Sequence, residues 1–223
     1  MQRAINHYIK NMKLLVPLHG VAAIFFPVGE IDKGGTCEFA TKECLEMCAA
    51  FKNATDENII GYEHKLKVFE FITKVSLFLV CNQIVEDLSQ MNPKLLYWFA
   101  SGDCMEKYVN RISAIMEHLS LEGIIQCGFT RNKKLWKRTQ EIQNVNIALT
   151  MEKLEDISKT GIISGLISIP DYKTGKINLY TNSILRGSCG GYNTKLDEVV
   201  HKDNCKECYK MKKGCFTVFE DNE

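Results

Sequence analysis

Short apolar runs alternate with longer amphipathic stretches from residue 14 to about residue 182. The apolar runs have the length of strands, and the stretches between them repeat apolar residues at helical spacing. Because most of the strands are followed by a helical stretch, the pattern predicts an α/β fold with a parallel sheet. The six expected strands lie in the runs LHGVAAIFFPVG, KLLYWFASGD, EGIIQCGFTRN, NVNIALTME, GIISGLISIPD and KINLYTNS, and the turn DYKTGK joins the last two.

Two of the expected helices have clear boundary signals. A long helix is expected over about residues 63–91, where apolar residues recur on a broad face and Asn92-Pro93 supplies the stop. A shorter helix is expected to begin after a Thr41 cap and to carry Cys44 and Cys48 as it runs to residue 51.

The number of strand–helix units in the chain indicates the architecture to expect. An eight-unit barrel typically needs about 250 residues. Six units in fewer than about 180 residues favour an open, partial (β/α)6 barrel, which we assign to residues 1–186. A doubly wound sheet is the alternative, although no GxGxxG motif follows the first strand. Residues 187–223 are rich in Gly, Lys and Cys and are expected to form a small Cys-rich appendage or tail.

Charge and hydropathy narrow the classes of partner. The 223 residues carry a net charge of +1, and Lys and Arg are scattered, so the usual electrostatic argument for an obligatory nucleic-acid partner is missing. Pro17, His19 and Gly20 interrupt the first apolar run, which also lacks a signal-peptide cleavage site. The later run around Lys74 is too short and too charged to span a bilayer. We therefore expect a cytoplasmic protein with no membrane partner.

The chain contains ten cysteines, which is an unusually high number for its length. Disulfides would require export, whereas clustered cysteines in a reducing compartment more often hold metal. Cys37, Cys44 and Cys48 fall within twelve positions, after a Gly-rich loop and at the start of the expected short helix. Three thiolates leave one metal coordination position empty, and an open position is typical of a site that performs chemistry. The alternatives are a fourth ligand from elsewhere, such as a tail cysteine, or no metal at all.

A second group of cysteines lies in the expected tail. A CxxC pair with two further cysteines suits a closed four-thiolate site that holds zinc or an auxiliary iron–sulfur cluster. His201 is a possible substitute ligand. The three remaining thiols, Cys81, Cys104 and Cys127, are expected to be small buried hydrophobic residues. The four tail cysteines are Cys189, Cys205, Cys208 and Cys215.

Polar residues follow the expected strands at their carboxyl ends, which is where barrel enzymes place their active sites. Asp103 is expected to bind an amine or a ribose hydroxyl, and Arg131 a carboxylate or phosphate. The alternatives are that Gly-Asp forms an ordinary turn and that Arg131 is simply exposed. The expected ligand-binding residues are Ser101, Gly102, Asp103, Thr130, Arg131 and Thr150.

Five short motifs recur in this order in the phage gene-product-88 family, which this chain resembles: TCEFATKECLEMCAAF, WFASGDC, GFTRNKKLW, NVNIALT and CKECYKMKKGC. The arrangement also resembles the radical S-adenosylmethionine superfamily, a partial barrel whose first strand leads into a three-cysteine loop. That resemblance implies a [4Fe–4S] cluster on three thiolates, with S-adenosylmethionine on the fourth iron, and an auxiliary cluster in the tail. The spacing here is C-x6-C-x3-C where the superfamily has C-x3-C-x2-C, and residues 100–103 stand where it has Gly-Gly-Glu.

Two functions follow. The first is an iron–sulfur enzyme with a small-molecule or peptide substrate and an electron donor. The second is a non-catalytic module, stabilised by zinc or iron–sulfur sites, that binds nucleic acid or a protein. Lys206, Lys210, Lys212 and Lys213 around Tyr209 favour the second function, whereas Asp203 and Glu207 dilute that charge.

Overall fold

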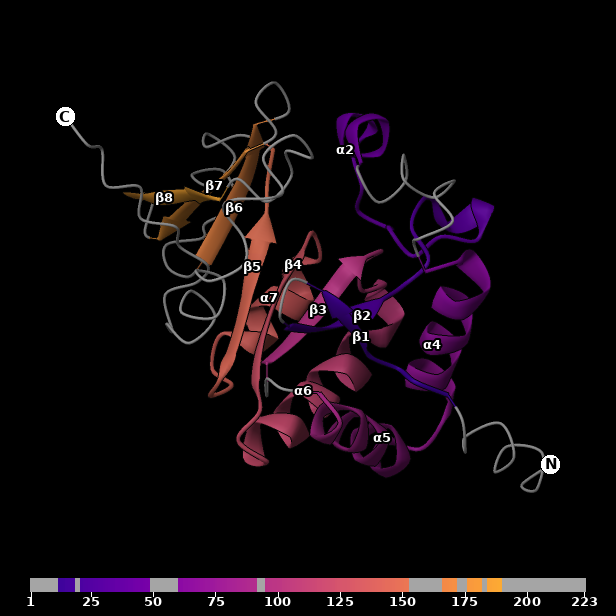
Figure 1. The fold of residues 1–223 in the computed structure, drawn as a ribbon. Helices are drawn as coiled ribbons and strands as arrows, with labels where there is room; N and C mark the ends of the chain where they lie inside the picture. Colours follow the sequence, from indigo (N-terminus) through magenta and orange to yellow (C-terminus); the bar gives the residue numbers. More distant parts are fainter. Residues whose placement is uncertain are drawn as a thin grey trace.

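The computed structural model describes residues 12–18, 21–48, 60–91, 95–152, 166–171, 176–181 and 184–189. These residues form one eight-stranded sheet whose strand order follows the sequence from β1 to β8 (Figure 1). The strands are β1 (Val16–Leu18), β2 (Val21–Phe25), β3 (Leu95–Ser101), β4 (Ile125–Thr130), β5 (Val145–Thr150), β6 (Leu166–Asp171), β7 (Lys176–Thr181) and β8 (Ile184–Cys189). The helices are η1 (Ile31–Lys33), α2 (Lys42–Met47), α4 (Tyr62–Lys74), α5 (Leu77–Ser89), η3 (Glu106–Tyr108), α6 (Val109–Leu121) and α7 (Lys133–Thr139).

The predicted mixed α/β class is confirmed, and the five strands from β2 to β6 run parallel. The last predicted strand does not continue this pattern, because β7 pairs antiparallel with β6 and β8 pairs antiparallel with β7. The expectation of six β/α units was therefore wrong for the sixth strand, which returns as a hairpin instead of through a helical crossover. The strand order does not reverse among the described strands, whereas a doubly wound sheet reverses at its centre.

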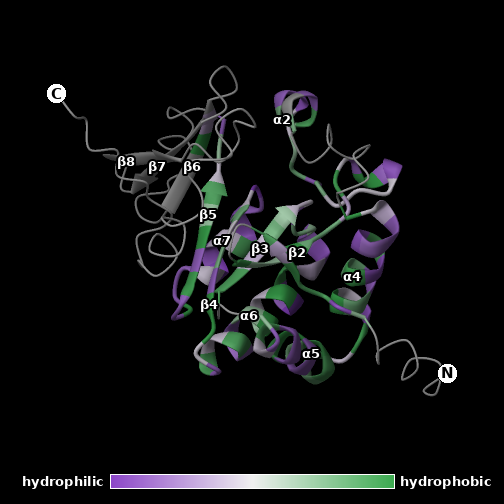
Figure 2. Cartoon of the chain, viewed as in Figure 1, coloured by the Kyte–Doolittle hydropathy of each residue, from purple (hydrophilic) through white to green (hydrophobic). Residues whose placement is uncertain are grey.

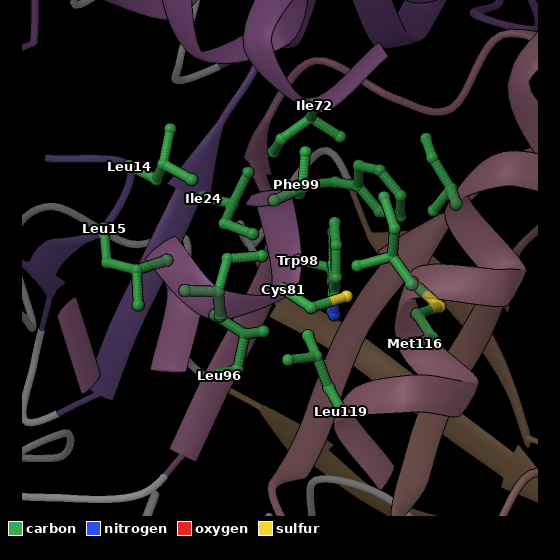
Figure 3. Packing of buried hydrophobic residues seen from close by; sticks show 14 of the residues in the cluster. Leu14, Leu15, Ile24, Ile72, Cys81, Leu96, Trp98, Phe99, Met116 and Leu119 are labelled. Carbon is green, nitrogen blue, oxygen red and sulfur yellow. The ribbon is translucent and has the colours of Figure 1, made fainter. Parts of the chain in front are cut away.

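The helices α4, α5, α6 and α7 pack against one face of this sheet. Successive side chains of a strand point to opposite faces of the sheet. Ala22, Ile24, Leu96 and Trp98 point to the face that the helices cover, and they form a single core cluster with the helices. The apolar colouring of Figure 2 follows the central strands and the inward sides of α5 and α6. Figure 3 shows Ile72 of α4 and Met116 and Leu119 of α6 around Trp98. Cys81 lies in this cluster, and Cys104 and Cys127 are also buried, as predicted for these three thiols.

The long helix expected over residues 63–91 is two helices, which is a correction. α4 ends at Lys74, Val75 is extended with φ −83° and ψ 155°, and Ser76 is the N-cap of α5. A β-branched residue followed by Ser favours leaving one helix and starting another. The apolar spacing continues across the break because both helices bury a face in the same core, and that continuity conceals the break in the sequence.

The predicted domain boundary between residues 186 and 187 falls inside β8, which pairs with β7 through Cys189. Residues 190–223, which include most of the expected tail, lie outside the described residues. Within the described ranges, no helix has the length and apolar content needed to cross a bilayer.

Candidate functional site

The loop that carries Cys37 is fixed from both sides by backbone hydrogen bonds. The amide of Cys37 donates to the Gly29 carbonyl at 2.9 Å, and the Gly29 amide donates to Cys37 Sγ at 3.4 Å. Gly35 packs directly on the backbone of Gly29, so a side chain at position 35 would collide with it. This close approach explains the Gly-rich sequence, and it holds the Cys37 thiol in one place.

Cys44 is positioned by the capping of α2. The predicted cap is confirmed, because Thr41 Oγ1 accepts a hydrogen bond from the Cys44 amide at 3.1 Å. The same hydroxyl donates to Glu152 Oε1 at 2.6 Å, which ties the helix to the end of β5. The predicted helix is too long, since it ends at Met47 and Cys48 is extended with ψ 111°. Cys44 and Cys48 therefore do not share a helical face.

The end of β3 is bound to the cysteine loop. Ser101 Oγ donates to the Phe26 carbonyl at 2.7 Å, and the amide of Asp103 donates to Thr36 Oγ1 at 3.1 Å. Gly102 between them has φ +72° and lies against Thr36 and Phe26, so it fits a position where other residues would be strained and crowded.

Asp103 joins the ends of β3 and β4. Its Oδ1 accepts from the Cys104 amide at 2.7 Å and from Thr130 Oγ1 at 2.6 Å, and its Oδ2 accepts from the Arg131 amide at 2.8 Å. Burial raises the pKa of this carboxyl to about 6, although the three hydrogen bonds oppose the shift. These contacts make Asp103 a brace between two strand ends, in addition to any ligand contact.

Arg131 is not a simple surface residue, because its side chain is 12% exposed and its Nη1 pairs with Glu152 Oε1 at 2.7 Å. Its positive charge lowers the pKa of the nearby Cys44 thiol, against the larger effect of burial. Thr150 ends β5, where it pairs with Ser168 of β6. Arg131 thus connects a cysteine to the strand ends, at the edge toward which β3 and β5 point in Figure 1 and where α2 lies.

The thiols are close enough to affect one another electrostatically. Burial, and then the charges of Asp103, Cys48 and Cys44, raise the pKa of Cys37 to about 12, against the Gly29 hydrogen bond. Burial also raises the pKa of Cys44, while Arg131 lowers it. The charge of Cys48 in turn acts on the buried Lys65 of α4. The structure therefore brings the three predicted cysteines and the predicted strand ends of β3 and β4 to one region.

Three thiols are donors of the type that binds zinc or an iron–sulfur cluster, although the raised pKa values of Cys37 and Cys44 keep these two thiols protonated without a metal. Among the described residues, no group of three or more His, Cys, Asp or Glu side chains has the arrangement that holds a metal ion. None of the six described thiols forms a disulfide. Holding a cluster would thus require the three cysteine side chains to turn toward one point.

The predicted tail site falls almost entirely outside the described residues. Cys189 is the last residue of β8, and only its backbone is described. Cys205, Cys208 and Cys215 lie outside the described residues.

Three residues of this region were not predicted from the sequence: Thr36, Lys65 and Glu152. The place of Thr36 beside Cys37 could have indicated its role. Lys65 and Glu152 look like ordinary surface charges in the sequence.

Comparison with known proteins gives no relative for this arrangement. No family model matches the chain, and neither a curated protein nor a solved structure does.

Proposed function

We propose that this chain is an iron–sulfur enzyme, similar to radical S-adenosylmethionine proteins, in which Cys37, Cys44 and Cys48 hold a [4Fe–4S] cluster. One iron stays open for S-adenosylmethionine or another small ligand. The observation that carries the proposal is the hydrogen bond between Thr36, beside Cys37, and Asp103 at the end of β3, which fixes the cysteine loop at the edge where β3 and β4 end. A metal would displace the protons of the three thiols and bind them as thiolates.

The finer fold that accompanies this function is a partial (β/α) barrel. It is supported by the parallel strands β2 to β6, whose order does not reverse, and by helices α4 to α7 on one face. Such a sheet curves around the face without helices, and its carboxyl edge then forms the mouth of the barrel. The cysteine loop follows β2 at that edge.

Each part of the site has a proposed role. The three thiolates would hold the cluster, which would supply one-electron reduction of a small ligand. Arg131 places its positive charge near the Cys44 thiol and stays in place through its ion pair with Glu152. Asp103, Ser101 and Gly102 set the end of β3 over the loop, and Thr130 and Thr150 complete the edge on β4 and β5. An electron donor and a small-molecule or peptide substrate are the proposed partners, in the reducing cytoplasm of a prokaryote or a phage-infected cell.

The test is anaerobic reconstitution with iron and sulfide, followed by metal analysis and electron paramagnetic resonance of the reduced protein. The wild-type chain should bind about four irons at this site, and S-adenosylmethionine should alter the spectrum. Serine in place of Cys37, Cys44 or Cys48 should abolish both results. The matched control is Cys81→Ala, because Cys81 is buried in the helix–sheet core and should leave the cluster intact.

A cluster spectrum indifferent to S-adenosylmethionine but shifted by other small ligands would rule out S-adenosylmethionine and leave an open-iron enzyme of another kind. A chain that takes up zinc with four thiolate ligands and no iron would instead indicate the non-catalytic module that binds nucleic acid or a protein.

A further inference from the structure

A surface cavity lies at the amino edge of the parallel strands, away from the cysteine loop. Its volume is about 670 Å³, and small-molecule sites commonly measure roughly 300–1,000 Å³. Its lining comes from α6, from the end of α7 and from the loops that lead into β4 and β5. The cysteine loop follows β2 at the opposite, carboxyl edge, so the cavity is separate from the candidate site.

The two loops that line the cavity are held in place by hydrogen bonds. Ser120 Oγ of α6 donates to the carbonyl of Gln143, and the amide of Gln126 in β4 donates to the carbonyl of Asn144 at 2.7 Å. Gly123 and Asn144 have φ values of +75° and +60°, a conformation that glycine and asparagine adopt more readily than other residues. The walls of the cavity are therefore formed before any ligand enters.

Three charged side chains line this cavity and are exposed to solvent: Glu117, Arg138 and Glu141. The five ion pairs among the described residues include none of the three. A guanidinium group pairs with a carboxylate through two parallel hydrogen bonds, and each carboxylate can accept from an ammonium or guanidinium group. The lining thus offers a place for one anionic group and two cationic groups.

The cavity also has an apolar part. Leu121, at the end of α6, is 82% exposed, which is the largest exposed fraction among the large apolar side chains of the described residues. It lines the cavity together with the half-buried Ile142. A ligand with an aliphatic segment would remove this apolar surface from water, which is favourable.

We propose that this cavity binds a free cationic amino acid, lysine or arginine, with its carboxylate on Arg138 and its two cationic groups on Glu117 and Glu141. Its aliphatic stem lies against Leu121. The three charged side chains carry one more negative than positive charge, and such an amino acid carries one more positive than negative charge at neutral pH. A diamine would leave Arg138 without a carboxylate, and a dicarboxylic acid would face two like charges. The inference goes beyond the proposed function and does not depend on a metal.

The test is isothermal titration calorimetry of the full chain with L-lysine at low ionic strength. We expect a Kd of roughly 0.1–1 mM, as suits a ligand of this size in a solvent-exposed site. L-norleucine lacks the side-chain amine and cadaverine lacks the carboxylate, so each should bind roughly 10-fold more weakly than lysine.

Substitutions test the same contacts from the side of the protein. Arg138→Gln, Glu117→Gln and Glu141→Gln should each weaken lysine binding roughly 10-fold. Arg138→Gln should not weaken the binding of cadaverine, which has no carboxylate to lose. The matched control is Lys133→Gln, which removes an exposed cation at the other end of α7 and should bind lysine as wild type does.

Three results would overturn the inference. The first is no binding of lysine by the wild-type chain up to about 10 mM. The second is equal binding of lysine and cadaverine, because Arg138 would then not recognise a carboxylate. The third is lysine binding that none of the three cavity variants weakens. The titration uses protein without added iron and sulfide, so each of these results leaves the proposed function in place.

Discussion

At the scale of single residues, Asp103 shows how one side chain can serve both the fold and the site. Its carboxylate accepts three hydrogen bonds and joins β3 to β4 beside the cysteine loop. Its folded-state pKa of about 6 lies above the ordinary value of 3.8. The folded protein therefore binds this proton more tightly than the unfolded chain does. The resulting stabilisation is complete below about pH 4 and is lost as the pH rises through 6.

Asp103→Asn should remove this pH dependence. Two pKa units correspond to about 3 kcal/mol, so the wild-type free energy of unfolding should fall by up to that amount from this group between pH 4 and pH 7. The asparagine amide faces the Arg131 amide with a donor, which should cost about 1–3 kcal/mol at all pH values. Urea unfolding at four pH values measures both effects. Asp32→Asn, on the exposed η1, is the control and should keep the wild-type fall. If the free energy of unfolding of Asp103→Asn falls with pH as steeply as that of wild type, the Asp103 carboxyl is not the source of the pH dependence.

At the scale of elements, the junction between α4 and α5 depends on a side chain from a third helix. Arg111 of α6 donates through Nε to the Ile72 carbonyl at 2.6 Å, and its Nη2 donates to the Val75 carbonyl. These carbonyls belong to the end of α4, where the helix offers no amide partners. The break is therefore made possible by Arg111, which is 36 residues from Val75 along the chain.

Arg111→Met should destabilise the protein by about 1–3 kcal/mol, because the aliphatic stem is largely kept while two carbonyls lose their donors. The free energy of unfolding in urea measures the loss. Arg138→Met is the control, since Arg138 is exposed on α7 and should change stability by no more than about 0.5 kcal/mol. Equal stabilities of the two variants would mean that water replaces Arg111 at no cost.

The same junction explains which elements could be predicted from the sequence. The Thr41 cap is a local signal and was predicted, because the capping hydroxyl and the amide of Cys44 are three residues apart. The break at Val75 was not predicted, since its stabilising donor is distant in sequence and both helices share one apolar face. The antiparallel pairing of β6 and β7 was also missed. The turn predicted between them lies mostly outside the described residues.

At the scale of the whole molecule, parallel topology made the convergence of the site predictable. Strands β3 and β4 end at one edge, so Asp103, Thr130 and Arg131 had to meet there once the sheet was parallel. Lys65 and Glu152 could not be predicted, because their burial and pairing depend on how α4 and α2 dock. The position of Cys37 beside the end of β3 could not be predicted for the same reason, because it depends on loop hydrogen bonds that no spacing rule describes.

The chain beyond β8 carries most of the cysteines of the predicted tail site. Residues 190–223 are poor in apolar residues and carry Cys205, Cys208 and Cys215, so their order should come from metal ligation instead of a core. Cys205→Ser or Cys208→Ser should lower the bound zinc or iron and speed cleavage by proteinase K after residue 189.

The core cluster of the helices and sheet should stay intact in both variants, because its residues end at Ile147. Lys206→Gln is the control, since it keeps every thiol and should match wild type. Metal analysis and mass spectrometry of the fragments provide the readout. Unchanged metal and unchanged cleavage in both cysteine variants would show that these thiols hold no metal.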